Sequence, residues 1–414
     1  MRERTIVVGV SGGIAAYKAC ELVRWLKQEG AAVVVVMTPA AVEFVTPLTF
    51  EALSGNPVMR GMWGSQQSEA RLPERSARKV RGAVEHVDLA EAADCLVIAP
   101  ATADLMARLV HGEAPDALTA LALARRGPLI VCPAMDVEMW RHAATQANVA
   151  ELRSRGATIV GPETGALASG LSGPGRLAAL PVIVDAVKLA VAKRGSMAGL
   201  RVLVGAGRTE EALDPVRVLT NRSSGKMGCA VAEAARDRGA QVTMVAGPMS
   251  VEPPGGVQVL RVVSAKEMQQ AMARAAKDAD LVVMAAAVAD FRPARVRAEK
   301  LRRGDGPLAL SLEPTPDILA GLGATRKPGQ TLVGFALETS RGLARARAKL
   351  QTKGLDLVVL NAPEDGLGGD TNRVTLLERR SQRKLPLQSK REVADAVLER
   401  VLELRRATRG RRRS

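Results

Sequence analysis

Aromatic side chains are scarce in this 414-residue sequence, which holds three tryptophans, one tyrosine and four phenylalanines. Hydrophobic residues still make up 47% of the chain, so large cores must be built from Val, Leu, Ile and Ala. Aliphatic cores of this kind favour buried parallel strands covered by Ala-rich helices over an aromatic-rich β-sandwich. The length predicts two or three domains.

Cysteine and histidine are also rare. The four cysteines, Cys20, Cys95, Cys132 and Cys229, lie far apart in apolar segments, and the three histidines are scattered. Zinc sites and the disulfide frameworks of secreted domains need closely spaced ligands or paired cysteines. The pattern therefore predicts buried thiols in a reducing cytoplasm and argues against a structural zinc site.

Long hydrophobic runs are missing as well. No apolar stretch reaches the roughly 18 residues that a membrane-spanning helix needs. The start, MRERTIVVGV, lacks the apolar stretch and cleavage site of a signal peptide. The sequence therefore predicts a cytoplasmic protein with no membrane partner.

Negative charge is in the minority, since 59 Lys and Arg against 43 Asp and Glu give a formal net charge of +16. The basic residues are spread along the chain, with a local excess at 71–81 and in the last ten residues. No aromatic residues interleave with them to stack bases. A positive charge of this size can indicate a nucleic-acid partner, but the spread of the basic residues argues against specific nucleic-acid binding. Anionic small substrates such as phosphates explain the charge equally well.

The first half alternates short aliphatic runs with Ala-rich stretches, which predicts an open, doubly wound parallel sheet of the Rossmann or flavodoxin-like kind. A helix is expected within 11–30, and the polar segment 61–85 is typical of a mobile surface loop. Strands are expected at 5–10, 31–37, 94–100, 128–133 and 157–161.

The same alternation restarts after a linker-like stretch, KRGSMAGL, at 193–200. Strands are expected at 201–207, 241–247, 257–263, 281–287, 331–336 and 356–361. More strictly alternating segments at 307–314 and 372–379 predict a small antiparallel extension. We therefore expect two doubly wound α/β domains in tandem, over 1–194 and 195–405, and a basic disordered tail over 406–414.

Several loops of the first domain suit a ligand. In VSGGIAAYK, Gly12 and Gly13 let backbone N–H groups and a helix N-terminus approach an anion, although this pattern alone fits a tight turn equally well. PATADLMARLVHG (100–112) and CPAMDVEMW (132–140) follow strands at their C-terminal ends, where ligands bind in such sheets. The stretch GALASGLSGPGRL (165–177) is too rich in glycine for a regular helix or strand and predicts a loop.

Together with HVDLAEAAD (86–94), these stretches resemble the homo-oligomeric flavin-containing cysteine decarboxylases. The resemblance implies that Gly12, Gly13 and the following helix hold the phosphate of FMN, with Thr102 near the flavin. His86 matches the family's active-site histidine; without the surrounding motif, a satisfied histidine near a helix start would explain it. In the family, FMN oxidises the substrate thiol, and the thiocarbonyl is the electron sink for loss of carbon dioxide.

This sequence departs from the family pattern at three positions. Ser169 in ALASG takes the place of the cysteine that protonates the reduced product, and Asp136 in PAMD that of the asparagine that grips the substrate carboxylate. Asp104 in PATAD also replaces an asparagine. A hydroxyl is a far weaker acid than a thiol, whose pKa is about 8.5, and an ionised Asp136 would repel a carboxylate. By the resemblance, residues 165–177 form a flap over the substrate.

The strongest motif of the second domain is GAGRTEEALDPVRVLTNRSSGKMG (205–228), which resembles the signature of the phosphopantothenate–cysteine ligases. Its polar loop offers N–H donors, hydroxyls and the Lys226 cation to phosphate or acyl-phosphate oxygens. The resemblance implies that Asn221 orients an acyl-cytidylate for attack by the cysteine amine. Lys300, in EKLRR, would stabilise the charge that develops at phosphorus; a solvated lysine run is the alternative. The residues implied to bind CTP are Ala285, Ala286, Asp290, Lys300, Pro316, Asp317, Ile318, Leu319, Phe335, Lys349 and Lys353.

Over residues 4–403 the chain is similar to the bifunctional enzymes of coenzyme A biosynthesis, in which a phosphopantothenoylcysteine decarboxylase is fused to a phosphopantothenate–cysteine ligase. The resemblance implies ligation of 4′-phosphopantothenate and cysteine with CTP and Mg²⁺, then FMN-dependent decarboxylation to 4′-phosphopantetheine. The alternative is an active ligase whose decarboxylase-like FMN module is impaired by Ser169, Asp136 and Asp104. Trimeric flavin domains and dimeric ligase domains, combined into a dodecamer, are also implied.

Overall fold

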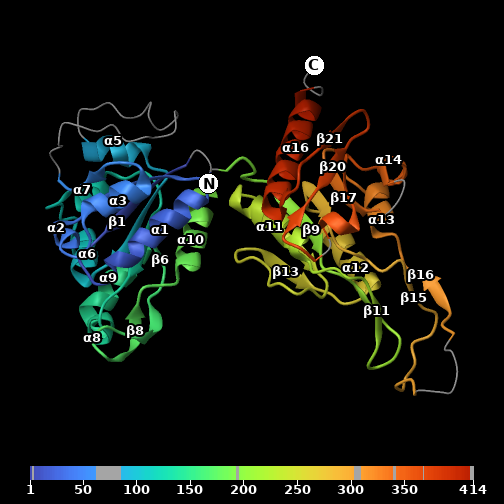
Figure 1. Ribbon diagram of the computed structural model, residues 1–414, viewed down its shortest axis with the longest axis horizontal. Coiled ribbons are helices and arrows are strands. Elements are labelled where there is room, and N and C mark those ends of the chain that lie inside the picture. Colours follow the sequence, from blue (N-terminus) through green and yellow to red (C-terminus); the bar gives the residue numbers. More distant parts are fainter. Residues whose placement is uncertain are drawn as a thin grey trace. The chain divides into compact units, whose positions relative to one another are not determined.

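The computed structural model describes residue 1 and residues 4–61, 85–192, 195–302, 309–338, 342–366 and 368–410. The chain divides into two compact units, Met1–Val191 and Ala192–Ser414, which Figure 1 colours from blue to green and from green to red. The sequence analysis places the domain boundary at 194. Its predicted surface loop at 61–85 lies, apart from its two end residues, outside the described residues.

The first unit is built on a six-stranded parallel sheet with the order β3-β2-β1-β4-β5-β6. The chain winds outward from β1 in one direction and then in the other, so the strand order reverses between β1 and β4, as in a doubly wound fold. This confirms the predicted fold class, and only the last strand is clearly shorter than expected. The strands are β1 (Thr5–Val10), β2 (Ala32–Met37), β3 (Val58–Met59), β4 (Cys95–Ala101), β5 (Leu129–Pro133) and β6 (Thr158–Ile159).

Helices cover both faces of this sheet (Figure 1). In β1, Ile6 and Val8 belong to one core cluster and Val7 to another, because alternate side chains of a strand point to opposite faces. The first cluster includes residues of α1 (Ala16–Gln28), α3 (Pro47–Ser54) and α10 (Leu180–Ala192). The second includes residues of α5 (Glu85–Ala92), α6 (Ala103–His111), α7 (Ala117–Ala124) and α9 (Ala143–Ser154). The short helices α2 (Pro39–Val42) and α8 (Val137–Arg141) follow β2 and β5.

The prediction that 165–177 is a loop was wrong. β7 (Glu163–Ala166) and β8 (Ser172–Arg176) pair as an antiparallel hairpin, and only the turn between them is irregular. A Cβ on Gly173 would lie 2.6 Å from Cγ2 of Val137, and one on Gly175 would lie 2.3 Å from the carbonyl oxygen of Met135. Glycine within a strand here permits close approach to a neighbouring segment, which is a recognised role of strand glycines.

The second unit contains an eight-stranded sheet with the order β13-β12-β9-β14-β17-β18-β20-β21. Its first six strands are parallel, and β20 and β21 are antiparallel additions at one edge. The order again reverses next to the first strand, between β9 and β14. The strands are β9 (Arg201–Ala206), β12 (Gln241–Ala246), β13 (Gln258–Arg261), β14 (Leu281–Met284), β17 (Thr331–Leu337), β18 (Leu357–Asn361), β20 (Val374–Leu377) and β21 (Gln382–Lys384).

The predicted antiparallel extension is therefore present, but its two segments do not pair with each other. The segment at 372–379 contributes β20 to the main sheet, whereas from 307–314 only β16 (Leu312–Pro314) forms and pairs with β15 (Phe291–Pro293). Two other short ladders join β10 (Glu210–Ala212) to β11 (Val218–Thr220), and β19 (Thr371–Asn372) to β22 (Gln388–Ser389).

Helices also cover both faces of the second sheet. α11 (Lys226–Asp237) and α16 (Lys390–Gly410) share one core cluster, and α12 (Ala265–Ala276), α13 (Ile318–Ala324) and α14 (Gly342–Thr352) share the other. The short helix α15 (Pro363–Gly366) follows β18. Because α16 continues to Gly410, residues 406–410 are helical and the prediction of a disordered tail there was wrong; 411–414 lie outside the described residues.

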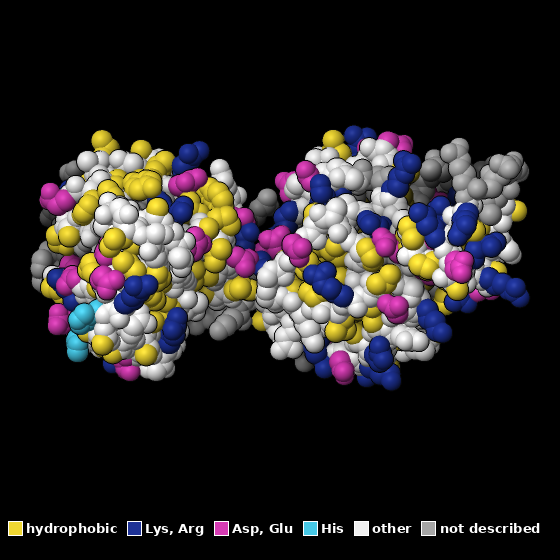
Figure 2. Space-filling view, turned by 90° about the horizontal axis from the view of Figure 1, so that it is seen from below, with side chains coloured by type: hydrophobic (Ala, Val, Ile, Leu, Met, Phe, Trp, Pro, Cys, Tyr) yellow, Lys and Arg dark blue, Asp and Glu magenta, His cyan; other side chains and the backbone are white. Residues whose placement is uncertain are grey.

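All four cysteines are free thiols; Cys95 and Cys132 are buried, whereas Cys20 and Cys229 are half-buried. Among the described helices, none is both long and apolar enough to cross a membrane. On the face of the second unit seen in Figure 2, Lys and Arg side chains are spread among other types.

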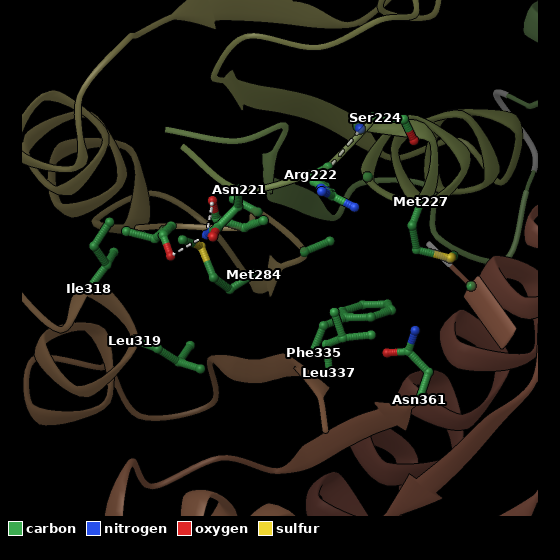
Figure 3. A pocket seen from close by; sticks show the side chains of 18 of the residues that line it. Asn221, Arg222, Ser224, Met227, Met284, Ile318, Leu319, Phe335, Leu337 and Asn361 are labelled. Atoms are coloured by element: carbon green, nitrogen blue, oxygen red, sulfur yellow. Dashed lines mark hydrogen bonds between the residues drawn. The ribbon is translucent and has the colours of Figure 1, made fainter. Parts of the chain in front are cut away.

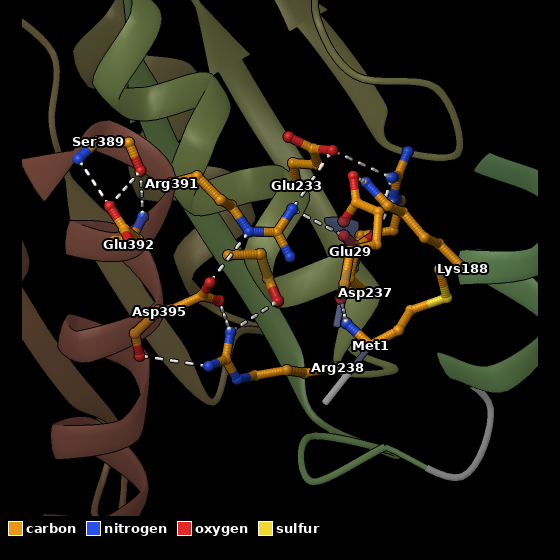
Figure 4. Close-up of polar contacts among 12 residues, drawn as sticks. Met1, Glu29, Lys188, Glu233, Asp237, Arg238, Ser389, Arg391, Glu392 and Asp395 are labelled. Carbon is orange, nitrogen blue, oxygen red and sulfur yellow. Dashed lines mark hydrogen bonds and ion pairs between the residues drawn. The ribbon is translucent and has the colours of Figure 1, made fainter. Parts of the chain in front are cut away.

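An ion-pair network joins α11 to α16 (Figure 4). The guanidinium of Arg391 lies 2.8 Å from Asp237, 3.3 Å from Glu233 and 3.3 Å from Asp395. Although its burial lowers the pKa of Arg391, the three carboxylates raise that pKa overall. The Asp237 side chain is only 9% exposed, so it depends on protein cations rather than water for its charge balance.

We expect Arg391→Leu to lower the free energy of unfolding of the second unit by about 1–3 kcal/mol, because a half-buried cluster of carboxylates loses a shared cation. Arg261→Leu is the matched control, since Arg261 pairs at 3.7 Å with Glu252 while 70% exposed. Exposed pairs contribute about 0–1 kcal/mol. Urea unfolding of both variants measures the difference, and equal losses would contradict a structural role for the network.

Candidate active sites

The carboxyl ends of β1 and β4 bring together three of the residues predicted to bind FMN. The loop after β1 holds Gly12 and Gly13, and Thr102 follows β4. Ser11 links the two loops, because its buried hydroxyl donates to the carbonyl oxygen of Pro100 at 2.8 Å and accepts from the N–H of Thr102 at 3.1 Å. The point where the strand order of an open α/β sheet reverses is where such folds bind ligands.

The local geometry here suits an anion. The N-cap residue of α1 is Ala15, which has no side chain able to accept a hydrogen bond from the first turn, whereas Thr102 caps α6. A Cβ on Gly12 would lie 2.4 Å from Cβ of Ala40, so only glycine fits there. A helix start without a side-chain acceptor, reached over a glycine loop, fits the phosphate of a cofactor such as FMN.

His86 lies in the first turn of α5 and is half-buried. Its Nδ1 atom is buried, and it has no hydrogen-bond partner among the described residues. Buried ring nitrogens in proteins normally have a partner, so this atom is compatible with a position that faces a ligand.

Asp136 and Ser169, two of the three departures from the decarboxylase pattern, contact each other. The Ser169 hydroxyl, in the turn between β7 and β8, donates to Oδ2 of Asp136 at 2.5 Å. Oδ1 of Asp136 accepts from the N–H of Glu138 at 3.2 Å, so Asp136 also caps α8. These two hydrogen bonds, the Ser169 bond first, lower the pKa of Asp136, which is therefore ionised at neutral pH.

The third departure, Asp104, has a different partner. Its two carboxylate oxygens each lie 3.1 Å from a nitrogen of Arg108, one turn later on α6. Arg108 also lies 3.8 Å from Asp116. Asp136 is thus hydrogen-bonded to Ser169, whereas Asp104 forms an ion pair with Arg108.

The second unit contains a cavity of about 660 Å³, part of which Figure 3 shows from close by. It is bordered by residues at the carboxyl ends of β14, β17 and β18 and by the N-terminus of α11. Except for Lys300, every residue that the sequence analysis assigned to the ligase site lines this cavity. They are Asn221, Ala285, Ala286, Asp290, Pro316, Asp317, Ile318, Leu319, Phe335, Lys349 and Lys353.

Asn221 is held firmly at the cavity. Its side-chain nitrogen donates to the carbonyl oxygens of Ala287 at 3.2 Å and Val288 at 3.0 Å, as the dashed lines in Figure 3 show. Both N–H bonds of the amide are therefore used, and the amide oxygen remains able to accept a further hydrogen bond.

Two lysines mark the end of the cavity near α13 and α14. Lys349 donates to the carbonyl oxygen of Phe335 at 2.7 Å, and Lys353 lies 2.8 Å from Asp317. Burial first, and then the charge of Lys353, lower the pKa of Lys349. Two cations with one carboxylate between them leave positive charge suited to a polyphosphate.

Lys226 and Lys390 also line the cavity. Lys226 donates to Asp370 at 2.7 Å and to the carbonyl oxygen of Gly368 at 3.2 Å, and Lys390 donates to the carbonyl oxygen of Gly369. The sequence analysis missed Lys390, Asn361 and Asn372. The position of Asn361 at the carboxyl end of a predicted strand was a usable signal, whereas nothing in the sequence pointed to Lys390.

Lys300 is not among the residues found to line the cavity in the described part of the chain. It is exposed in an irregular segment that follows β15 and precedes the undescribed residues 303–308. Its assignment to the ligase site remains a prediction.

Comparisons with known proteins cover both units. Residues 1–192 match the family model Flavoprotein, and 197–404 match the DNA/pantothenate metabolism flavoprotein C-terminal domain. Over 374 residues the chain is 46% identical to the coenzyme A biosynthesis bifunctional protein CoaBC of Mycolicibacterium smegmatis, with 87% of each chain covered. The chain belongs to the CoaBC family.

Other members of the CoaBC family are also similar to this chain. The protein of Bacillus subtilis is 40% identical over 415 residues, which covers 99% of each chain. A crystal structure of the C-terminal domain of CoaBC is 39% identical, covers 50% of this chain and 96% of its own, and superposes with a TM-score of 0.44. The resemblance seen in the sequence is confirmed: this is an enzyme of the bifunctional CoaBC family, in which decarboxylase and ligase domains share one chain.

Proposed function

We propose that the second unit of this CoaBC family member joins 4′-phosphopantothenate to cysteine with CTP and Mg²⁺ through an acyl-cytidylate, and that the first unit holds FMN for decarboxylation of the product to 4′-phosphopantetheine. The observation that carries the ligase half is the cavity of the second unit, since it gathers side chains from loops far apart in the sequence. Those side chains supply both phosphate-binding cations and an amide that can orient an amine.

The ligase reaction has two displacements, and this chain supplies groups for each. In the first, the carboxylate of 4′-phosphopantothenate attacks the α-phosphorus of CTP and pyrophosphate leaves. Lys349 and Lys353 bind the triphosphate, and Lys300 stabilises charge on the phosphorus oxygens. In the second, the cysteine amine attacks the acyl carbon and CMP leaves. The amide oxygen of Asn221 accepts a hydrogen bond from that amine and orients it.

Mg²⁺ fits this site as a companion of the nucleotide. Among the described residues, no cluster of three or more His, Cys, Asp or Glu side chains could hold a metal. Because Mg²⁺ is commonly bound through substrate phosphates with few protein ligands, such a cluster is not required.

The purified protein is expected to form CMP and pyrophosphate in equal amounts from 4′-phosphopantothenate, cysteine, CTP and Mg²⁺. Product quantification by liquid chromatography measures this, with omission of cysteine as one control. Replacing CTP by ATP is the other control, and equal rates with both nucleotides would overturn the assignment of the cavity.

The residues at the β1–β4 edge fit FMN, so the first unit has its own role. When bound, FMN supplies two-electron oxidation of a substrate thiol. Gly12, Gly13 and the first turn of α1 would hold its phosphate, Thr102 lies beside that loop, and His86 offers a buried ring nitrogen. Trimers of the flavin unit and dimers of the ligase unit remain predictions that native mass spectrometry would test.

One observation favours a second candidate function, in which an active ligase carries a flavin module of impaired decarboxylase activity. The Ser169 hydroxyl already donates a hydrogen bond to Asp136, and the Asp136 carboxylate is ionised. A substrate carboxylate would therefore be repelled by the negative charge of Asp136, and the flap has a hydroxyl at position 169 in place of the thiol that delivers a proton. In this second candidate function, the chain forms little or no 4′-phosphopantetheine.

A further inference from the structure

The DPVR stretch of the ligase signature, residues 214–217, lies in the turn between β10 and β11, and the site described above does not use it. Asp214 is 2% exposed. Its Oδ1 accepts from the backbone N–H groups of Val216 and Arg217, both at 2.8 Å. These two hydrogen bonds make the turn rigid, because the side-chain carboxylate binds the backbone two and three residues further along the chain.

The second oxygen of Asp214 reaches a distant segment. Oδ2 accepts from the N–H of Leu301 at 3.0 Å and from the Arg217 guanidinium at 3.0 Å. The same Arg217 nitrogen, Nη1, donates to the carbonyl oxygen of Leu301 at 2.7 Å. Both polar backbone atoms of Leu301 are therefore bound by one aspartate–arginine pair.

A further bond holds the same segment to the turn. The N–H of Arg297 donates to the carbonyl oxygen of Leu213 at 3.0 Å. Residues 297–301 thus run along the turn and are attached at both ends, although residues 294–300 are exposed and outside any helix or strand. Without these bonds, little in the local structure would fix the backbone there.

The residue before Leu301 is Lys300. The two hydrogen bonds to the Leu301 backbone therefore also restrict the position of the Lys300 backbone. We propose that Asp214 and Arg217 are positioning residues of the ligase: they clamp the Leu301 backbone and so fix the segment from which the Lys300 side chain reaches the cavity for the first displacement. This proposal rests on the proposed function of Lys300. It assigns a role to Asp214 that needs no contact with substrate.

Charge is essential to the clamp. The pKa of Asp214 is lowered to about 2, mainly by the hydrogen bond from the N–H of Leu301. Burial acts in the opposite direction and raises this pKa, whereas the hydrogen bonds from Val216 and Arg217 lower it further. Asp214 is therefore ionised under assay conditions, and its two oxygens accept four hydrogen bonds. An asparagine has only one acceptor oxygen, and its NH₂ group would face a donor.

Hydrogen exchange tests the clamp directly on the full chain. In Asp214→Asn we expect the Leu301 amide to exchange at least about tenfold faster than in the wild type. Glu211→Gln is the matched control, because Glu211 is also buried on the same hairpin but accepts from the N–H of Ala265 at 2.8 Å. It should leave Leu301 exchange unchanged. Unchanged exchange in Asp214→Asn would overturn the clamp.

Kinetics test whether the clamp acts through Lys300. We expect Asp214→Asn to lower kcat for pyrophosphate release about tenfold, with KM for CTP within twofold of wild type because Lys349 and Lys353 are untouched. In the Lys300→Gln background the same change should have no further effect, since residues that act through one group are not additive. A full additional tenfold loss in that background would overturn the positioning role.

Arg217→Ala keeps the proposal testable if Asp214→Asn fails to fold, because the Arg217 side chain is 44% exposed and its loss leaves the buried carboxylate intact. The same faster exchange of Leu301 and the same non-additivity with Lys300→Gln are expected. If Lys300→Gln proves fully active, the role of Lys300 in the proposed function fails, whereas the exchange data still decide whether the clamp exists.

Discussion

Lys300→Gln is expected to lower the rate of CMP and pyrophosphate formation by about a hundredfold or more. Removing one group that stabilises charge developing in a transition state typically costs a factor of 10²–10³. KM for CTP should change little, because Lys349 and Lys353 still bind the triphosphate. Steady-state assays of pyrophosphate release measure both quantities.

Lys266→Gln is the control for this prediction, since Lys266 is an exposed lysine of α12 in the same unit and does not line the cavity. Its activity should stay within twofold of wild type. Asn221→Asp provides a contrast: the acyl-cytidylate should form with release of pyrophosphate, and its consumption by cysteine should be slow. Full activity of Lys300→Gln would show that another group stabilises the charge at phosphorus.

The second large effect is expected in the first unit, where Ser169→Cys combined with Asp136→Asn should raise 4′-phosphopantetheine formation by a factor of about 10–1,000. Repulsion between two partly solvated carboxylates about 4 Å apart amounts to about 1–4 kcal/mol, which sets this range. Each single change should restore little product formation. Ser169→Cys leaves the repulsion between Asp136 and the substrate carboxylate, and Asp136→Asn leaves no thiol to deliver the proton. Mass spectrometry of the products of the four proteins gives the coupling between the positions.

Ser172→Cys combined with Asp136→Asn is the matched control. Ser172 is an exposed serine at the start of β8 in the same hairpin, so the thiol is present but at another position. This variant should form no more product than Asp136→Asn alone. Rapid and complete formation of 4′-phosphopantetheine by the unmodified chain would show that serine and aspartate suffice for the reaction.

Much of the fold follows from hydrophobic patterning. The runs TIVVGV and RVLVGAG are apolar on successive residues, which marks strands buried on both faces, and β1 and β9 formed where these runs lie. The loops after such strands were therefore predictable ligand positions, and for the second unit the cavity gathers the side chains that those loops carry. The resemblance to a known family supplied the residue roles that patterning alone does not give.

Other features depend on tertiary contacts that no local pattern records. The β7–β8 hairpin forms because Gly173 and Gly175 fit against the 135–137 segment, although isolated glycines disfavour strands. Lys390 reaches the cavity only because the chain returns to it more than 150 residues after Asn221. The contact between Asp136 and Ser169 spans 33 residues, and the sequence treats the two positions as separate departures.

The Ser169–Asp136 hydrogen bond also constrains how this site can change by mutation and selection. A lineage that acquires only a cysteine at 169 keeps the negative charge at 136, and one that acquires only an asparagine at 136 keeps a hairpin turn without a thiol. Neither substitution alone increases product formation, so selection does not favour either one by itself. Descendants of this chain are therefore expected to carry serine and aspartate together, or cysteine and asparagine together, and seldom a mixed pair.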